Sequence, residues 1–137
     1  VLLDTCVLAE LHRPKGNKRV RKWFERTPSE SMFLSVLVLG EVAKGIALLK
    51  PGKKKQALSE WLDKLEGDFQ DRIVSVDQET ARLWGELSAR ARQSGRPLPV
   101  VDGLLSASAI QKGFRVATRN LESFQLAGVQ IINPWEE

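Results

Sequence analysis

Short apolar segments alternate with longer helical patterns along this chain, and this alternation limits the possible folds more than any other feature. The strand-like segments are 1–3, 32–35, 73–76, 115–118 and 130–132. Strands that alternate with helices predict a mostly parallel sheet with helices on both of its faces. We therefore expect an α/β fold with three layers and a mostly parallel five-stranded sheet.

Apolar residues recur with helical spacing between the strand-like segments. Helices are expected over 7–11 and 17–26, after Ser35, after the turn at Pro51-Gly52, and over 78–94 and 102–112. The helix after Ser35 should bury a stripe made of Val36, Leu39, Val42, Ala43, Ile46 and Ala47. Because no repeat or linker divides this pattern, residues 1–137 are expected to form one domain.

The charge balance and the cysteine content narrow the class further. The 137 residues include 21 Lys and Arg against 17 Asp and Glu, a net charge of +4 that fits either a polyanionic partner or plain solubility. One cysteine cannot form an internal disulfide, which favours the cytoplasm. No stretch is apolar enough to span a membrane, and the segment 1–11 lacks the basic leader of a signal peptide.

Three acidic residues are embedded in apolar sequence rather than in surface charge runs. Asp4 follows the first strand-like segment, Glu41 lies within the apolar helix after the second, and Asp102 follows Val100-Val101 where a helix begins. Ligands of an open parallel sheet bind beyond the carboxyl ends of its strands. Each acid therefore occupies a position where such a sheet places its functional site.

Carboxylates that are buried near one another are costly unless a cation neutralises them. Mg²⁺ prefers oxygen ligands, and it can ionise a water, hold a phosphodiester and stabilise the leaving oxygen. The single His12 and the single Cys6 cannot make a zinc site of the usual kind. The acids and the basic surface together predict hydrolysis of phosphodiesters that depends on Mg²⁺ or Mn²⁺.

Each acid also has a purely structural alternative. Asp4 and Asp102 can cap helices, and Glu41 can pair with Lys44 on its own helix. A phosphatase with Asp4 as covalent nucleophile would need a second acid two residues later, where Cys6 stands. Cys6 is no better as a nucleophile, because no histidine is placed to activate it and the neighbouring carboxylate disfavours a thiolate.

Five segments resemble PIN domains of the VapC and FitB type, in the same order and over nearly the whole chain. They are VLLDT at 1–5, LGEVAKGI at 39–46, PLPVVDGLLSASA at 97–109, ATRN at 117–120 followed by Phe124, and the ending INPW at 132–135. Each segment is weak evidence alone. Their combination identifies residues 1–137 as similar to a single PIN domain.

The resemblance implies a Mg²⁺- or Mn²⁺-dependent endoribonuclease, the toxin of a type II toxin–antitoxin pair. Asp4, Glu41 and Asp102 would hold the metal, and Thr118 and Asn120 would hold water or a carboxylate at the edge of the site. It also implies RNA as substrate, a homodimer, and a cognate antitoxin through which alone the protein contacts DNA. The alternative is a weakly catalytic PIN scaffold that acts with its antitoxin as a DNA-binding regulatory complex.

The chain departs from the PIN pattern at two positions. Cys6 stands where relatives often have Asn, and it is a weaker hydrogen-bonding partner for Asp4. Ser123 stands where relatives often have a fourth acid, and Glu122 would point elsewhere on a helix. Three acids can hold one Mg²⁺, so a firmly held second ion is not expected.

Basic and aromatic residues offer candidates for contacts with nucleic acid or protein. The basic runs 15–26 and 53–55 could follow a phosphate backbone or could be solvated helix faces. Better candidates for phosphate contacts precede Asp102 in sequence, namely Arg90, Arg92 and Arg96. Three tryptophans lie on apolar helix faces, namely Trp23, Trp61 and Trp84, and are expected to pack in the core. The alternative is that they line a groove for a dimer partner or an antitoxin. Trp135 is expected against the edge of the sheet.

Overall fold

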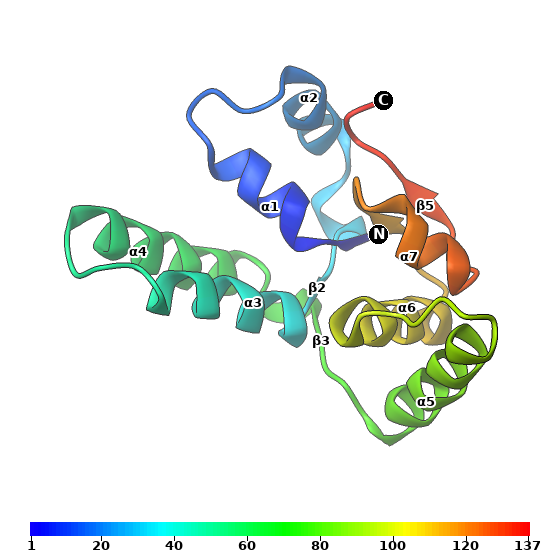
Figure 1. Ribbon diagram of the computed structural model, residues 1–137. Helices are drawn as coiled ribbons and strands as arrows, with labels where there is room; N and C mark the ends of the chain where they lie inside the picture. Colours follow the sequence, from blue (N-terminus) through cyan, green and yellow to red (C-terminus); the bar gives the residue numbers. More distant parts are fainter.

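The computed structural model describes residues 1–137, which form seven α-helices around five short strands (Figure 1). The strands are β1 (Leu2–Leu3), β2 (Leu34–Ser35), β3 (Ile73–Val74), β4 (Val116–Ala117) and β5 (Ile131–Ile132). The helices are α1 (Thr5–His12), α2 (Lys18–Arg26), α3 (Val36–Ala47), α4 (Lys53–Asp68), α5 (Gln78–Gln93), α6 (Val100–Lys112) and α7 (Leu121–Leu126). Single 3-10 turns, Ser29–Ser31 and Gln70–Arg72, precede β2 and β3.

All strand pairs are parallel, as predicted, but the strands form two small sheets rather than one ladder of five. β1, β4 and β5 pair in the order β1-β4-β5, and β2 pairs with β3. A parallel bridge between Leu2 and Phe33 joins the two sheets. Its hydrogen bonds run from Phe33 N to Val1 O (2.8 Å) and from Leu3 N to Phe33 O (3.0 Å). The carboxyl ends of all five strands therefore point the same way.

The central strands lie in the middle of the hydrophobic core. Leu2, Leu3, Val116 and Ala117 are all at most 1% exposed, so β1 and β4 are covered on both faces. Figure 1 shows α1 and α2 on one side of the strands and α5 and α6 on the other, while α3 and α4 form a pair that extends sideways. None of these helices combines the length and the apolar character of a membrane span.

Helix α3 is apolar on nearly every side, and the buried side that the sequence predicted for it is partly wrong. Ile46 of the expected stripe is buried, but the other buried side chain is Val38. Val36 is 39% exposed, and Ala43 and Ala47 are exposed as well. A helix with apolar residues all round gives no periodicity from which its buried side can be read.

Helix α6 also begins earlier than predicted. Val100 and Val101 form its first residues, with Pro99 at the N-cap position, so Asp102 lies inside the first turn instead of opening the helix. The predicted end of the helix is confirmed, because Gly113 adopts the left-handed conformation of a C-cap glycine with φ of 71°.

Candidate active site

Asp4 lies at the carboxyl end of β1 and is only 7% exposed. Its backbone N–H donates to Ala117 O (3.0 Å), which continues the pairing with β4. Its Oδ1 accepts a hydrogen bond from Thr5 N (2.8 Å), and its Oδ2 accepts one from the hydroxyl of Thr118 (2.8 Å). Asp4 therefore caps α1, as the structural alternative predicted, and at the same time turns a carboxylate toward the edge of the sheet.

Burial raises the pKa of Asp4 above its ordinary value of 3.8. The hydrogen bonds from Thr118 and Thr5 lower the pKa, whereas the neighbouring charges of Asp102 and Glu41 raise it further. Desolvation and like charges thus outweigh the hydrogen bonds that favour the carboxylate. The charged form of Asp4 is therefore disfavoured in the metal-free site.

Glu41 is presented by α3 and points toward α1 rather than along its own helix. The hydroxyl of Thr5 donates a 2.7 Å hydrogen bond to Glu41 Oε1. No ion pair joins Glu41 to Lys44, so this alternative for the residue is not realised. The bond from Thr5 brings the second acid beside the residue that follows the first.

The side chain of Asp102 is held by a hydrogen bond from a residue outside α6. Asn120 Nδ2 donates to Asp102 Oδ2 (3.0 Å), and Asn120 N donates to the hydroxyl of Thr118 (2.9 Å). The hydroxyl of Thr118, which is fully buried, in turn donates a hydrogen bond to Asp4. The segment after β4 thereby links the first acid to the third through Thr118 and Asn120.

An open cavity of about 370 Å³ lies among these side chains. Its lining consists of Asp4, Thr5, Cys6, Glu41, Asp102, Arg119 and Asn120. Four of the five residues expected in the site line this cavity, and Thr118 supports it from behind. The structure therefore brings together all five residues, which lie far apart in the sequence.

The acids surround a space instead of converging on a single point. No three His, Cys, Asp or Glu side chains form a ready-made coordination shell. Mg²⁺ commonly keeps several of its waters and binds proteins through one or two carboxylates. A cavity of about 370 Å³ has room for a hydrated ion, since a water occupies about 30 Å³. The residues present fit a hard divalent cation of this kind.

The two positions that depart from the PIN pattern add little to the polar contacts. Cys6 Sγ lies 3.8 Å from Asp4 Oδ2 and 3.6 Å from the hydroxyl of Thr118. Burial raises the pKa of the Cys6 thiol, so it stays protonated at neutral pH. Ser123 and Glu122 on α7 do not line the cavity. The cavity therefore contains three carboxylates and no fourth.

The arginines that the sequence suggested for phosphate contacts lie outside this cavity. Arg90, Arg92 and Arg96, which precede Asp102 in the chain, are absent from its lining, whereas Arg119 is part of it. Their proximity to Asp102 in sequence does not bring them to the cavity, because α5 leads away from the site before α6 returns to it, and their contact with RNA stays a prediction. The available signal was the place of Arg119 between Thr118 and Asn120, two residues already assigned to the site.

The tryptophans divide between the core and two partly open positions. Trp23 is 4% exposed and belongs to the core, as expected. Half-buried Trp61 packs against the exposed ring of His12 in a tilted arrangement, their centroids 4.5 Å apart, in a second cavity of about 390 Å³. That cavity also includes Thr5 and Glu41, so it adjoins the acidic one. Trp84 packs against Gly103, the residue after Asp102.

The fold and the ring of acids at its carboxyl edge define the PIN-domain class. The model of the PIN domain matches residues 1–128, and the chain belongs to this family. The plasmid stability protein StbB of Pseudomonas syringae pv. tomato is 37% identical, over 99% of both chains. Toxin FitB of Neisseria gonorrhoeae is 36% identical, over 100% of this chain and 99% of its own. A VapC ribonuclease of Sinorhizobium fredii is 33% identical over 99% and 98%.

Solved structures resemble the chain equally closely. The crystal structure of FitAcB from Neisseria gonorrhoeae superposes with a TM-score of 0.93 at 36% identity, over 99% of both chains. A structure of FitAB bound to a DNA fragment gives 0.92, with 98% of this chain and 94% of that chain covered. VapBC2 of Rickettsia felis, at 20% identity and a TM-score of 0.80, supports the fold alone.

Proposed function

We propose that this protein is a Mg²⁺- or Mn²⁺-dependent endoribonuclease and the toxin of a type II toxin–antitoxin system. The observation that carries the proposal is the position of Asp4, Glu41 and Asp102 around one open cavity, with burial and mutual repulsion acting on Asp4. A relative named as a VapC ribonuclease and another named as toxin FitB support the same reading.

Asp4, Glu41 and Asp102 are the residues that would hold the metal ion. When bound, a divalent ion lowers the pKa of a water and stabilises the oxygen that leaves the phosphodiester. Thr118 fixes Asp4 through Oδ2, and Asn120 fixes Asp102 through its Oδ2, so each carboxylate keeps lone pairs free toward the cavity. Thr5 holds Glu41 in the same way.

The similarity to these toxins also suggests the partners of this protein. We propose RNA as substrate, a homodimer, a cognate antitoxin, and contact with DNA only through that antitoxin, with the whole of residues 1–137 acting as one PIN domain. The relative FitAB is bound to DNA in its structure, and its FitB chain is 36% identical to this one. We also propose that the protein acts in the cytoplasm, because its RNA substrate would be found there.

The test is cleavage of a mixed single-stranded RNA pool by the purified, antitoxin-free protein, with Mg²⁺ and with EDTA. Asp102→Asn should abolish cleavage while the protein stays folded, because the amide oxygen can still accept the bond from Asn120. Asp63→Asn, an exposed acid on α4 outside the cavity, is the matched control and should cleave normally. Cleavage that persists in EDTA or in Asp102→Asn would overturn the proposal.

The second candidate is a PIN scaffold with little catalysis that acts on DNA together with its antitoxin. The weak contact from Cys6 to Asp4 and the absence of a fourth acid favour it. No cleavage by folded protein loaded with Mg²⁺, together with tight operator binding by the antitoxin complex, would select this candidate.

A further inference from the structure

Arg119 is the only basic residue that lines the acidic cavity. It lies beside three carboxylates, yet it forms no ion pair with any of them. No hydrogen bond occupies its side chain either. A guanidinium carries five N–H donors in one plane, and all five of these remain free.

The side chain of Arg119 is instead held over the ring of Trp135. Its Cζ lies 4.5 Å from the centroid of the indole, which is a cation–π contact. Contact through the π face uses none of the guanidinium N–H groups as hydrogen-bond donors. Trp135 therefore fixes the guanidinium without using its donors.

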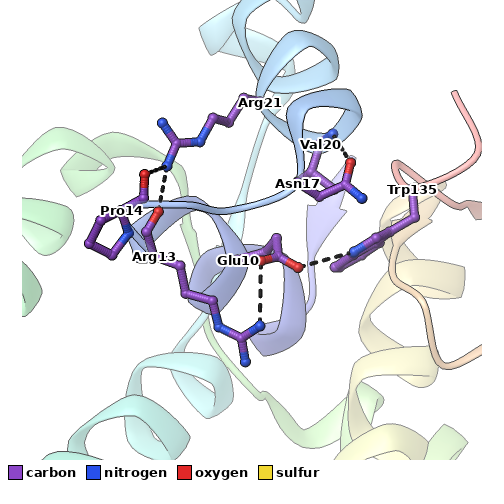
Figure 2. Close-up of polar contacts among 7 residues, drawn as sticks. All are labelled: Glu10, Arg13, Pro14, Asn17, Val20, Arg21 and Trp135. Atoms are coloured by element: carbon purple, nitrogen blue, oxygen red, sulfur yellow. Dashed lines mark hydrogen bonds and ion pairs between the residues drawn. The ribbon is translucent and has the colours of Figure 1, made fainter.

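The indole of Trp135 is itself anchored on α1. Its Nε1 donates a 3.2 Å hydrogen bond to Glu10 Oε1, and Glu10 is only 7% exposed. Arg13 pairs with the other oxygen of Glu10 at 3.6 Å. Figure 2 shows the indole pointing from the C-terminal segment toward Glu10, with Arg13 approaching the same carboxylate. Asn133 further fixes the backbone N–H of Trp135 (3.1 Å).

Three consecutive residues after β4 thus have three different partners. Thr118 bonds Asp4, Arg119 lies on Trp135, and Asn120 bonds Asp102. The hydrogen bonds of Thr118 and Asn120 with the acids hold the backbone of Arg119, which lies between them, beside the cavity. Its side chain is directed by a contact that involves none of the acids.

The charges in the cavity show what such an arginine could do. Three ionised carboxylates and one divalent ion leave a formal charge of −1, which repels the phosphodiester of a nucleic acid. The charge of Arg119 brings this sum to zero. Arginine also matches a phosphate with two parallel hydrogen bonds, which a lysine cannot provide.

We infer that Arg119 binds a backbone phosphate of the RNA beside the three acids, and that Trp135, anchored by Glu10, positions it. The inference rests on the proposed nuclease function. Arg119 contacts the substrate in this account, whereas Trp135 and Glu10 act only through Arg119. Pairing with a neighbouring carboxylate would otherwise occupy the guanidinium before RNA arrives.

Binding is measured first, without cleavage. In the Asp102→Asn background with Mg²⁺, fluorescence anisotropy gives the affinity for a labelled single-stranded RNA oligonucleotide. Arg119→Gln should weaken it about 10- to 100-fold, the range for hydrogen bonds to charged groups. Arg119→Lys should recover only part of the loss. Arg82→Gln removes the same charge from an exposed position on α5 outside the cavity and is the matched control, expected to bind as the parent does.

Cleavage kinetics then separate positioning from folding. Trp135→Leu removes the π face and should raise KM with little change in kcat, whereas Trp135→Phe keeps the face and should restore most of the affinity. Glu10→Gln keeps an acceptor for the indole and should behave like Trp135→Phe. A merely structural role for Trp135 would lower the melting temperature and kcat together, and Arg119→Gln decides the case where Trp135→Leu does not fold.

The outcomes for the inference and for the nuclease proposal are distinct. If Arg119→Gln binds RNA as tightly as Arg82→Gln while the wild type cleaves RNA, the inference is wrong and the nuclease stands. If Arg119→Gln loses RNA and the wild type never cleaves, the nuclease proposal is wrong and the phosphate-binding arginine stands.

Discussion

The hydroxyl of Thr118 donates a 2.8 Å hydrogen bond to Asp4 Oδ2, although the two residues are 114 positions apart in sequence. Both lie at the carboxyl ends of the paired strands β4 and β1, and the hydroxyl has no access to solvent. A buried carboxylate that loses such a donor cannot replace it with water. This single contact therefore supports the charged form of Asp4.

Thr118→Val should remove that support without changing the shape of the side chain. A buried acceptor left without its donor costs about 1–3 kcal/mol, which urea unfolding measures as a lower midpoint. Asn120 N loses its acceptor in the same variant. Thr118→Ser keeps the hydroxyl and should stay near the wild type. Equal losses in the Ser and Val variants would show that the methyl group matters instead.

The stability of the metal-free protein should depend on the titration of Asp4. Its pKa is raised on folding, so the folded state binds more protons than the unfolded state between pH 3.8 and the raised pKa. The contribution of Asp4 therefore makes stability fall as the pH rises through that window. In EDTA at pH 7, Asp4→Asn should melt at a higher temperature than the wild type.

Two comparisons complete the melting experiment on Asp4. The difference between Asp4→Asn and the wild type should vanish below pH 3.8, where both side chains are uncharged. Mg²⁺ should raise the melting temperature of the wild type and leave the variant unchanged. A variant that melts lower than the wild type in EDTA at pH 7 would show that the hydrogen bonds of Asp4 outweigh its desolvation.

Gly103 should tolerate no side chain. A Cβ at this position would lie 2.9 Å from Cδ1 and 3.0 Å from Nε1 of Trp84. Gly103→Ala should cost about 1–3 kcal/mol through overpacking and should weaken metal binding by shifting Asp102 beside it. Calorimetric titration with Mg²⁺ or Mn²⁺ and urea unfolding measure the two effects.

The double variant Gly103→Ala with Trp84→Phe tests the cause of that loss. The smaller ring makes room for the methyl group and removes an indole N–H that has no hydrogen-bond partner. The two changes should therefore be coupled, with the double variant more stable than the sum of its parts predicts. Additive losses would place the strain elsewhere.

Asp77 should contribute to stability and not to catalysis. It caps α5 by accepting bonds from Thr80 N and from the Thr80 hydroxyl (both 2.9 Å), and these bonds lower its pKa. A lowered pKa means that the stabilisation is present at neutral pH and is lost as the pH falls below the ordinary value of 3.8. Asp77→Ala should melt earlier at pH 7 and cleave RNA normally, with Asp77→Asn in between.

The positions of the strands and of the first acid could be predicted from sequence for one reason. Strands that are buried on both faces read as short apolar runs, and the residue after such a run lies at the ligand-binding edge. Asp4 and Thr118 both satisfy this rule. Asp102 lies at the same edge for a different reason, because it belongs to the first turn of α6, which begins at Val100.

The contacts of Arg119 could not be predicted from local sequence. The role of Arg119 depends on Trp135, whose own position depends on Glu10, and these residues lie on three separate segments. Local patterns report which side of an element is buried, but not which elements meet. For the same reason the sequence favoured Arg90, a neighbour of Asp102 along the chain but not in the cavity.

The contacts of residues 118–120 with partners far away in the sequence also affect how the protein folds during synthesis. A nascent chain leaves the ribosome from its N-terminus, so Asp4 emerges more than a hundred residues before Thr118 can reach it. The hydrogen bond of Asp102 likewise cannot form before Asn120 is synthesised, nor the contact of Arg119 before Trp135 is synthesised. The acidic cavity can therefore be completed only after residue 135 has been synthesised, and no nascent intermediate that stops before residue 118 contains it.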